Sequence, residues 1–264
     1  MPAIFVLGDS TAKNTVAGQQ GWGTPLANYF DPAKVRIENR AHAGTSSRTF
    51  YNGDWPRIAP EVRPGDFALI VFGINDGLGS FNGTGATRSS LSGLGTETQE
   101  VNGQTVHTYG WYLTKMATEA AEHGARVFLL TVTARNIWSN PHARFNDATI
   151  LSKDESYAIA EDRIERGTGS GKYTQWTIEL GQQLHLPVLD LTNLQADRFE
   201  KLGREKVMVN YADHNHTFPA GADLVASIVV SGLKGFQNSP FTSLLSPLGR
   251  AVEVADAKHI KEIR

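Results

Sequence analysis

Apolar residues gather in short runs along the chain, and longer stretches with helical spacing separate these runs. Continuous apolar runs are typical of parallel strands that are covered on both faces. They predict five strands, at residues 4–7, 35–39, 67–72, 127–132 and 188–191. Residues 110–123 and 173–184 repeat apolar positions every three or four residues, which predicts helices. The alternation predicts an α/β fold, a three-layer doubly wound sandwich with a mainly parallel five-stranded sheet.

Glycine and proline mark the ends of the predicted helices. Gly124 follows the helix at 110–123, where a helix C-terminus favours glycine. Pro219 stands in the first turn of the last helix, and Gly235 follows its end. Six apolar residues recur along that helix at three- and four-residue spacing: Ala222, Val225, Ala226, Val229, Val230 and Leu233. This spacing predicts an amphipathic helix that begins directly after a polar segment.

Two long polar segments interrupt the alternation. Residues 77–107 are rich in Gly, Ser, Thr and Asn, and residues 137–171 have few apolar anchors. Segments of this length in a compact domain usually serve as lids or binding loops. Because no internal repeat or Pro-rich linker is present, we expect residues 1–264 to form a single domain.

Composition excludes several classes of function. Apolar residues make up 40% of the 264 residues, charged residues 20% and aromatic residues 9%, which is typical of a soluble globular protein. A net charge of -2 without a Lys/Arg cluster argues against a nucleic-acid partner. The longest apolar runs are far shorter than the ~20 residues of a membrane span, so no membrane partner is expected. The lack of cysteine excludes disulfides, thiolate metal sites and cysteine nucleophiles.

A serine follows the first predicted strand. Residues 8–12 read Gly-Asp-Ser-Thr-Ala, so Ser10 lies where a buried strand emerges at the carboxyl edge of the sheet. Open α/β sheets bind ligands at that edge. Ser10 is therefore a candidate nucleophile, although a helix N-cap explains these five residues equally well.

An aspartate and a histidine precede the last helix. Residues 213–217 read Asp-His-Asn-His-Thr, and the spacing lets Asp213 accept a hydrogen bond from Nδ1 of His216. The Nε2 atom of His216 then remains free to take a proton from a serine. A polar loop with helix-capping residues is the alternative. His214 and His216 also invite a metal site, but the sequence offers no convincing third ligand, so no metal is expected.

Two further motifs follow predicted strands. Asn75 lies in residues 73–77, Gly-Ile-Asn-Asp-Gly, and can direct its side-chain N–H toward the same edge as Ser10. Gly44 lies in residues 39–48 after the second strand, and its N–H can approach a ligand closely. Each motif alone is equally compatible with a structural turn or loop.

The order of the four motifs favours the catalytic interpretation. They fall after strands one, two and three and before the last helix, which places them on one rim of the sheet. Together they supply a nucleophile, a base with its orienting acid, and additional oxyanion donors. This is the complete set of groups for acyl transfer.

These residues resemble the four sequence blocks of the SGNH (GDSL-type) hydrolases. Ser10, Gly44, Asn75 and the Asp213–His216 pair stand in the order of that superfamily, with each block intact. Within it, the chain is most similar to the rhamnogalacturonan acetylesterases. Further similarity lies in residues 39–50, 95–100, 107–112 and 219–222. The resemblance covers most of residues 3–235, whereas residues 237–264 form an extension that matches no motif of the family.

The resemblance implies the flavodoxin-like SGNH hydrolase fold and a serine esterase without a cofactor. Ser10, His216 and Asp213 would be the catalytic residues, and Ser10, Gly44 and Asn75 the oxyanion hole. The implied function is removal of O-acetyl groups from plant cell-wall polysaccharide, with pectic rhamnogalacturonan as substrate. Family members are exported, which implies a secreted or periplasmic protein. Residues 1–7 show no signal peptide, which leaves a cytoplasmic location open.

The sequence leaves several other functions open. An acetylxylan esterase or another short-chain esterase would use the same residues, and a lipid esterase or thioesterase would need an apolar groove that the polar segments do not suggest. A non-catalytic carbohydrate-binding module is disfavoured by the complete set of catalytic groups. Four aromatic residues can stack on sugar rings, although aromatic residues more often belong to the core: Phe81, Tyr109, Trp111 and Trp138.

Overall fold

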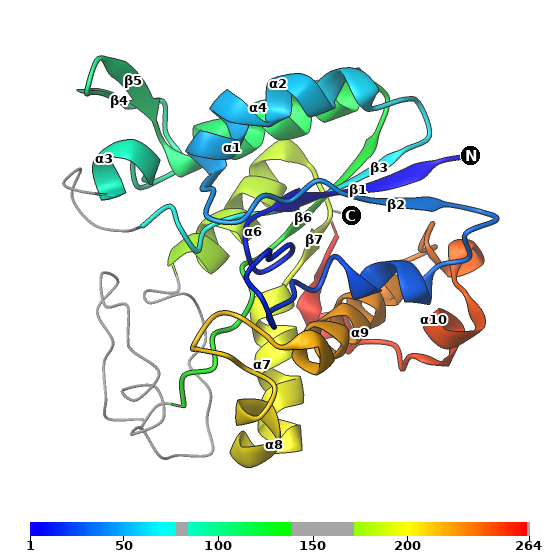
Figure 1. The fold of residues 1–264 in the computed structure, drawn as a ribbon. Helices are drawn as coiled ribbons and strands as arrows, with labels where there is room; N and C mark the ends of the chain where they lie inside the picture. Colours follow the sequence, from blue (N-terminus) through cyan, green and yellow to red (C-terminus); the bar gives the residue numbers. More distant parts are fainter. Residues whose placement is uncertain (78–83, 139–171, 263–264) are drawn as a thin grey trace.

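A computed structural model describes residues 1–77, 84–138 and 172–262 of the chain (Figure 1). A central sheet runs through this part in the strand order β2-β1-β3-β6-β7-β8. The strands are β1 (Ala3–Gly8), β2 (Arg36–Asn39), β3 (Phe67–Val71), β6 (Arg126–Leu130), β7 (Val188–Leu189) and β8 (Ile260–Lys261). The first five are parallel and coincide with the five strands that the sequence predicts, so this part of the prediction is confirmed. The number of strands was wrong, because β8 pairs with β7 as a sixth, antiparallel strand.

Helices cover both faces of the sheet, as predicted for a three-layer sandwich (Figure 1). One layer contains α1 (Ser47–Gly53), α2 (Trp55–Ile58), α4 (Tyr109–Glu122) and α6 (Lys172–Leu184). The other contains η1 (Pro25–Tyr29), α7 (Leu191–Leu202), α8 (Arg204–Met208), α9 (Pro219–Gly235) and α10 (Pro247–Ala251). The helices predicted at 110–123, at 173–184 and after Pro219 are thereby confirmed.

Strand β1 shows why its sequence is continuously apolar. Ile4 and Val6 pack with η1, α7 and α9, whereas Phe5 and Leu7 pack with α1, α4 and α6. All four side chains are at most 2% exposed. Alternate residues thus serve two separate cores, which requires apolar side chains at every position.

The strand order creates a switch point at β1. The chain passes from β1 outward to β2 on one side and then returns to β3 on the other. The connections that leave the carboxyl ends of β1 and β3 therefore run to opposite sides, and open α/β sheets bind ligands at such a switch point.

The polar segment at 77–107 contains regular structure that the sequence analysis did not predict. The described part includes α3 (Thr84–Arg88), β4 (Thr98–Val101) and β5 (Gln104–His107), and β4 and β5 form an antiparallel hairpin. Asn102 and Gly103 connect the two strands with positive φ angles of 52° and 73°. An Asn-Gly pair between strands is a strong hairpin signal that the composition of the segment obscured. Residues 139–171, which make up most of the second polar segment, lie outside the described residues.

The C-terminal tail packs on the layer that contains α9. After α9 it forms η3 (Thr242–Leu244), α10, η4 (Ala257–His259) and β8. The Phe241 ring is fully buried, with its centroid 5.0 Å from that of Phe67 and 4.9 Å from that of Phe128. The tail thus contributes side chains to the apolar core.

No helix in the described ranges combines the length and the hydropathy that a membrane crossing requires.

Candidate active site

Ser10 lies in the turn that directly follows β1. Gly8 ends the strand so close to β3 that a Cβ atom there would stand 2.9 Å from a methyl group of Val71. The next residues curl into a helical turn, in which the N–H of Ala12 and of Lys13 donates to the carbonyl of Asp9. Among the described residues, no group accepts a hydrogen bond from the N–H of Ser10. That N–H is available to a ligand at the carboxyl edge of the sheet.

His216 joins Ser10 to Asp213. The Oγ atom of Ser10 lies 2.9 Å from Nε2 of His216, and Nδ1 of the same ring lies 2.7 Å from a carboxylate oxygen of Asp213. Because a carboxylate only accepts, Nδ1 carries the proton and Nε2 faces the serine as an acceptor. The other oxygen of Asp213 accepts from the backbone N–H of Asn215 and of His216, both at 2.7 Å. The loop therefore holds the carboxylate in place without help from distant residues.

Gly44 and Asn75 converge on the same region. Gly44 has a φ of +83°, and its N–H has no acceptor among the described residues. Apart from its two chain neighbours, the Nη1 atom of Arg88 is the one described group within 4 Å of a Cβ atom built on Gly44, at 3.8 Å, so that side of the residue is not crowded. Asn75 donates from Nδ2 to the carbonyl of Thr45 at 2.8 Å, which leaves its second amide hydrogen free to face a ligand.

Burial and hydrogen bonding shift the pKa values of His216, Asp213 and Asp9. The Asp213 carboxylate raises the pKa of His216 by its hydrogen bond, and the charges of Asp213 and Asp9 add to this increase against the opposing effect of burial. For Asp213, burial opposes ionisation, but hydrogen bonds from His216 and Asn215 outweigh it and lower the pKa to about 2. Burial raises the pKa of Asp9 to about 6 despite two hydrogen bonds from Thr11. Asp213 is therefore an anion near neutral pH, as the orientation of His216 requires.

Asp76 is a residue of the site to which the sequence analysis assigned no role. It is 1% exposed and accepts from the backbone N–H and the hydroxyl of Ser47, and from the hydroxyl of Ser90 at 2.9 Å. Burial raises its pKa. The signal was its position in the Asn75–Asp76 pair, but only the tertiary structure shows that it fixes the start of α1.

The alternative of a metal site at His214 and His216 gains no support. Both ring nitrogens of His216 face Ser10 and Asp213. His214 is 7% exposed, and burial lowers its pKa. In the described ranges, no three His, Cys, Asp or Glu side chains gather in a way that could hold a metal ion.

The four aromatic residues considered for sugar stacking differ in their exposure. Tyr109 and Trp138 are fully buried and belong to the core. Trp111 is partly exposed and stacks on the His107 ring at a centroid distance of 3.8 Å. Phe81 lies outside the described residues.

The chain resembles known ester hydrolases over most of its length. The sequence profile of the GDSL-like Lipase/Acylhydrolase family matches residues 6–224. A protein of Emericella nidulans, rhamnogalacturonan acetylesterase, is 30% identical over 244 residues, which cover 87% of this chain and 86% of that protein. The resemblance to SGNH (GDSL-type) hydrolases is thereby confirmed.

Solved structures show the same fold. Protein YxiM from Bacillus subtilis matches with a TM-score of 0.66 and 23% identity over 88% of this chain and 56% of that one. The present chain thus spans about half the length of YxiM. A catalytic mutant of Axe2, an acetylxylan esterase from Geobacillus stearothermophilus, matches with a TM-score of 0.56 and 15% identity over 89% of this chain and 95% of that one.

Proposed function

The chain belongs to the GDSL-like lipase/acylhydrolase family and is an ester hydrolase, and we propose that it removes O-acetyl groups from a plant cell-wall polysaccharide, with rhamnogalacturonan as its substrate. The ester chemistry is supported by two short contacts: Ser10 Oγ lies within hydrogen-bond distance of Nε2 of His216, and Nδ1 of His216 lies within that distance of Asp213. Support for the substrate comes from the 30% identical rhamnogalacturonan acetylesterase. The likeness to an acetylxylan esterase has 15% identity and bears on the fold alone.

In the proposed mechanism, Nε2 of His216 takes the proton from Ser10 as Oγ attacks the acetyl carbonyl carbon. Asp213 holds the ring in the required tautomer and stabilises its positive charge. The N–H groups of Ser10 and Gly44 and the side chain of Asn75 hold the negative charge that develops on the carbonyl oxygen. The sugar oxygen then leaves with the proton from His216, and the acetyl group stays on Ser10.

A water molecule completes the reaction. His216 takes a proton from this water as its oxygen attacks the acetyl-serine ester, and the ring returns the proton to Ser10 Oγ when acetate departs. Two half-reactions thus use the same base and the same oxyanion donors. No step requires a group other than substrate, water and the residues described above.

The test is acetate release from acetylated rhamnogalacturonan, acetylated xylan and a series of aryl esters from acetate to octanoate. We expect the highest kcat/KM on the pectic substrate, and among aryl esters on acetate, because a small acetyl pocket gains nothing from a longer chain. A lipid esterase would instead gain about 0.8 kcal/mol for each buried methylene. A preference for xylan would reassign the glycan, and a maximum at octanoate would contradict the carbohydrate assignment.

Ser10→Ala is the control for the chemistry. The variant should fold normally and lose at least about 1,000-fold in kcat, because the nucleophile is absent. Activity above about a tenth of the wild-type value would contradict the assignment of Ser10.

A further inference from the structure

Residues 42–46, the Gly44 loop, contact a segment that is distant in sequence. This segment, residues 86–90, contains the end of α3 and the residues that follow it. Nη1 of Arg88 donates to the carbonyl of Gly44 at 3.1 Å, and the Ser46 hydroxyl donates to the carbonyl of Arg88. The Gly44 loop is therefore bound at two points, Gly44 and Ser46, to one residue of the 86–90 segment.

Two further contacts reinforce this attachment immediately after the loop. Arg48 is 2% exposed and donates to the carbonyl of Ser89 at 3.0 Å. Ser90 donates to Asp76, which in turn accepts from Ser47. The 86–90 segment is thus hydrogen-bonded both to the Gly44 loop and to the first turn of α1.

No helix or strand that the structure describes holds the Gly44 N–H. Gly44 lies outside helices and strands, and its φ of +83° is a conformation in which glycine is not strained but is also not confined. The Gly44 N–H belongs to the peptide unit that precedes Gly44, and hydrogen bonds hold the two units that follow. Arg88 donates to the carbonyl of Gly44, and Asn75 donates to the carbonyl of Thr45. The N–H of Thr45 also donates to the carbonyl of His42, at 3.3 Å. Two successive peptide units after the Gly44 N–H are therefore tied to Asn75 and Arg88, which lie on different segments of the chain.

The position of Arg88 itself is not that of an ordinary surface arginine. Its side chain is partly buried, and its Nε atom is fully buried with no hydrogen-bond partner in the part of the chain that the structure describes. Its charge interacts with the buried carboxyls of Asp9 and Asp76. Its Nη1 atom also lies 3.8 Å from the position that a Cβ atom on Gly44 would take. Burial is the larger effect and lowers the pKa of Arg88, and the nearby carboxyls oppose it only in part.

We propose that Arg88 is a positioning residue for ester hydrolysis: by binding the Gly44 carbonyl, it keeps the Gly44 N–H directed at the carbonyl oxygen of the ester. The proposal rests on the proposed function only in its chemistry, the attack of Ser10 on an ester. It does not depend on which glycan carries the acetyl group. Arg88 acts through Gly44 and takes part in no proton transfer.

The experiment compares Arg88→Met with Arg88→Lys on a small aryl acetate. Removing an oxyanion donor itself typically costs about 100- to 1,000-fold in kcat, and losing the support of one donor should cost about 10- to 100-fold. We expect this loss in Arg88→Met, with KM within about threefold of wild type, because the interaction acts in the transition state. Arg88→Lys keeps a charged donor of similar reach and should recover at least about a third of the wild-type kcat.

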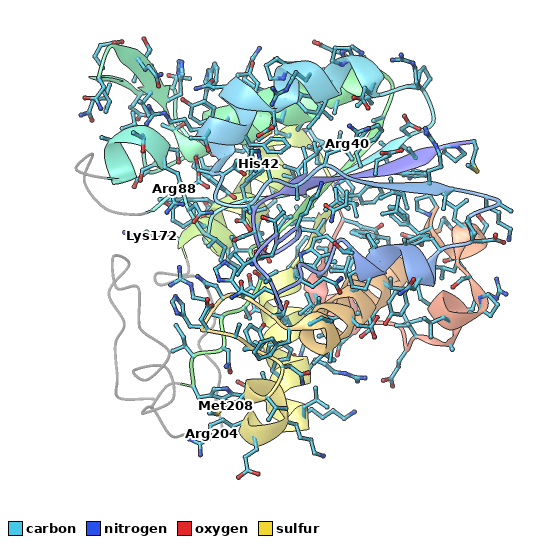
Figure 2. All side chains as sticks on the ribbon, in the orientation of Figure 1. Arg40, His42, Arg88, Lys172, Arg204 and Met208 are labelled. Carbon is cyan, nitrogen blue, oxygen red and sulfur yellow. The ribbon has the colours of Figure 1, made fainter. Side chains whose placement is uncertain are left out.

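Arg40→Met is the matched control. Arg40 precedes the Gly44 loop, binds Glu61 through Nη2 at 2.5 Å and, in the view of Figure 2, lies on the far side of His42 from Arg88. Its replacement removes a guanidinium from the segment between β2 and the Gly44 loop and leaves the hydrogen bonds of Gly44 in place. We expect its kcat to stay within about twofold of wild type.

A second measurement separates positioning from general loosening of the structure. Phenylboronic acid forms a tetrahedral adduct on a nucleophilic serine and places an oxygen where the ester oxyanion would lie. Its affinity should fall in Arg88→Met in parallel with kcat/KM, whereas the melting temperature and the affinity for acetate should change little. If Arg88→Met fails to fold, Arg88→Gln takes its place in both measurements, because its shorter, uncharged side chain cannot reach the Gly44 carbonyl, and the same losses relative to Arg88→Lys are expected.

The proposal is overturned if Arg88→Met keeps kcat within about twofold, or if its loss appears in KM alone. A failure of the proposed function looks different. In that case the wild-type protein would cleave aryl acetate but release no acetate from any polysaccharide, and the Arg88 comparison would still stand.

Discussion

Asp9 lies between the end of β1 and Ser10 and is 2% exposed. One of its oxygens accepts from the N–H of Thr11 at 2.9 Å and from the Thr11 hydroxyl at 2.8 Å. These bonds favour the carboxylate, but burial is the larger effect and raises the pKa of Asp9 to about 6. A buried carboxyl next to the nucleophile therefore affects both stability and activity.

Asp9 should make the protein less stable as the pH rises. A carboxyl whose pKa is higher in the folded state binds a proton there when the unfolded chain has already lost it. Stability is therefore lost between the ordinary pKa of 3.8 and the raised value of about 6, and the loss persists at higher pH. Two pKa units correspond to at most about 3 kcal/mol.

Asp9→Asn tests this effect, because its amide oxygen can accept the same two bonds from Thr11. We expect the variant to be more stable than wild type above pH 6, by up to about 3 kcal/mol, and to show no gain at pH 4. Urea unfolding at pH 4, 5 and 8 measures the difference. Since the Asp9 charge also raises the pKa of His216, the acid limb of kcat/KM should move to lower pH. A stability difference that does not vary with pH would contradict this account.

At the scale of elements, α9 positions the loop that contains Asp213 and His216. The loop closes on itself, because the N–H of Ala212 donates to the carbonyl of His216 at 2.8 Å. Thr217 bonds to the carbonyl of Gln20 at 2.7 Å, which ties the loop to the chain that follows Ser10. Gly221, in the first turn of α9, packs against the start of the loop. A Cβ atom there would stand 2.3 Å from the carbonyl oxygen of Asn210.

Gly221→Ala should therefore be harmful, although alanine favours helices by about 1 kcal/mol over glycine. The obstacle is backbone rather than a flexible side chain, so α9 or the loop must shift, which typically costs 1–3 kcal/mol. We expect a net loss of stability and a decrease in kcat of about 10-fold, because the shift displaces His216 relative to Ser10. Thermal unfolding and aryl acetate hydrolysis measure both effects.

Ser227→Ala, farther along α9, is the control for that comparison. Within the described ranges its hydroxyl bonds only to the Leu224 carbonyl one turn earlier, so the change should alter stability by less than about 0.5 kcal/mol and leave kcat unchanged. Equal effects of the two variants would show that the contact with Asn210 does not matter.

At the scale of the whole molecule, the C-terminal tail and the parallel sheet share one core. Phe241 lies in the tail after α9, and its ring packs against Phe67 of β3 and Phe128 of β6. Leu245 is also fully buried, and β8 extends the sheet. We therefore expect the chain to unfold as a single domain, tail included.

Phe241→Ala should lower the free energy of unfolding by about 3–5 kcal/mol, because it leaves a cavity between two buried rings. The loss should appear in one cooperative transition. Leu248→Ala is the control, because Leu248 is 51% exposed in the same tail and its loss should cost less than about 1 kcal/mol. Two separate transitions, or a loss in Phe241→Ala below about 1 kcal/mol, would show that the tail is a separate unit.

The sequence by itself determined the five parallel strands and the α/β class, and it predicted that Ser10, Gly44, Asn75, Asp213 and His216 meet at one edge of the sheet. These predictions depend on local features: strands covered on both faces must be apolar at every position, and a parallel sheet brings all carboxyl ends to one edge. The Asp213–His216 contact is local as well, since three residues separate the partners. Even the missed hairpin had a local signal in Asn102 and Gly103.

Only the tertiary structure decided the features whose partners are distant in sequence. Strand β8 has two residues and exists because β7 presents an open edge to the returning tail. Arg88 meets Gly44 across 44 residues, and nothing near either residue in the sequence indicates the contact. The raised pKa of Asp9 arises from burial by the folded chain as a whole. Such features depend on which surfaces come together, and no window of the sequence contains both sides of the contact.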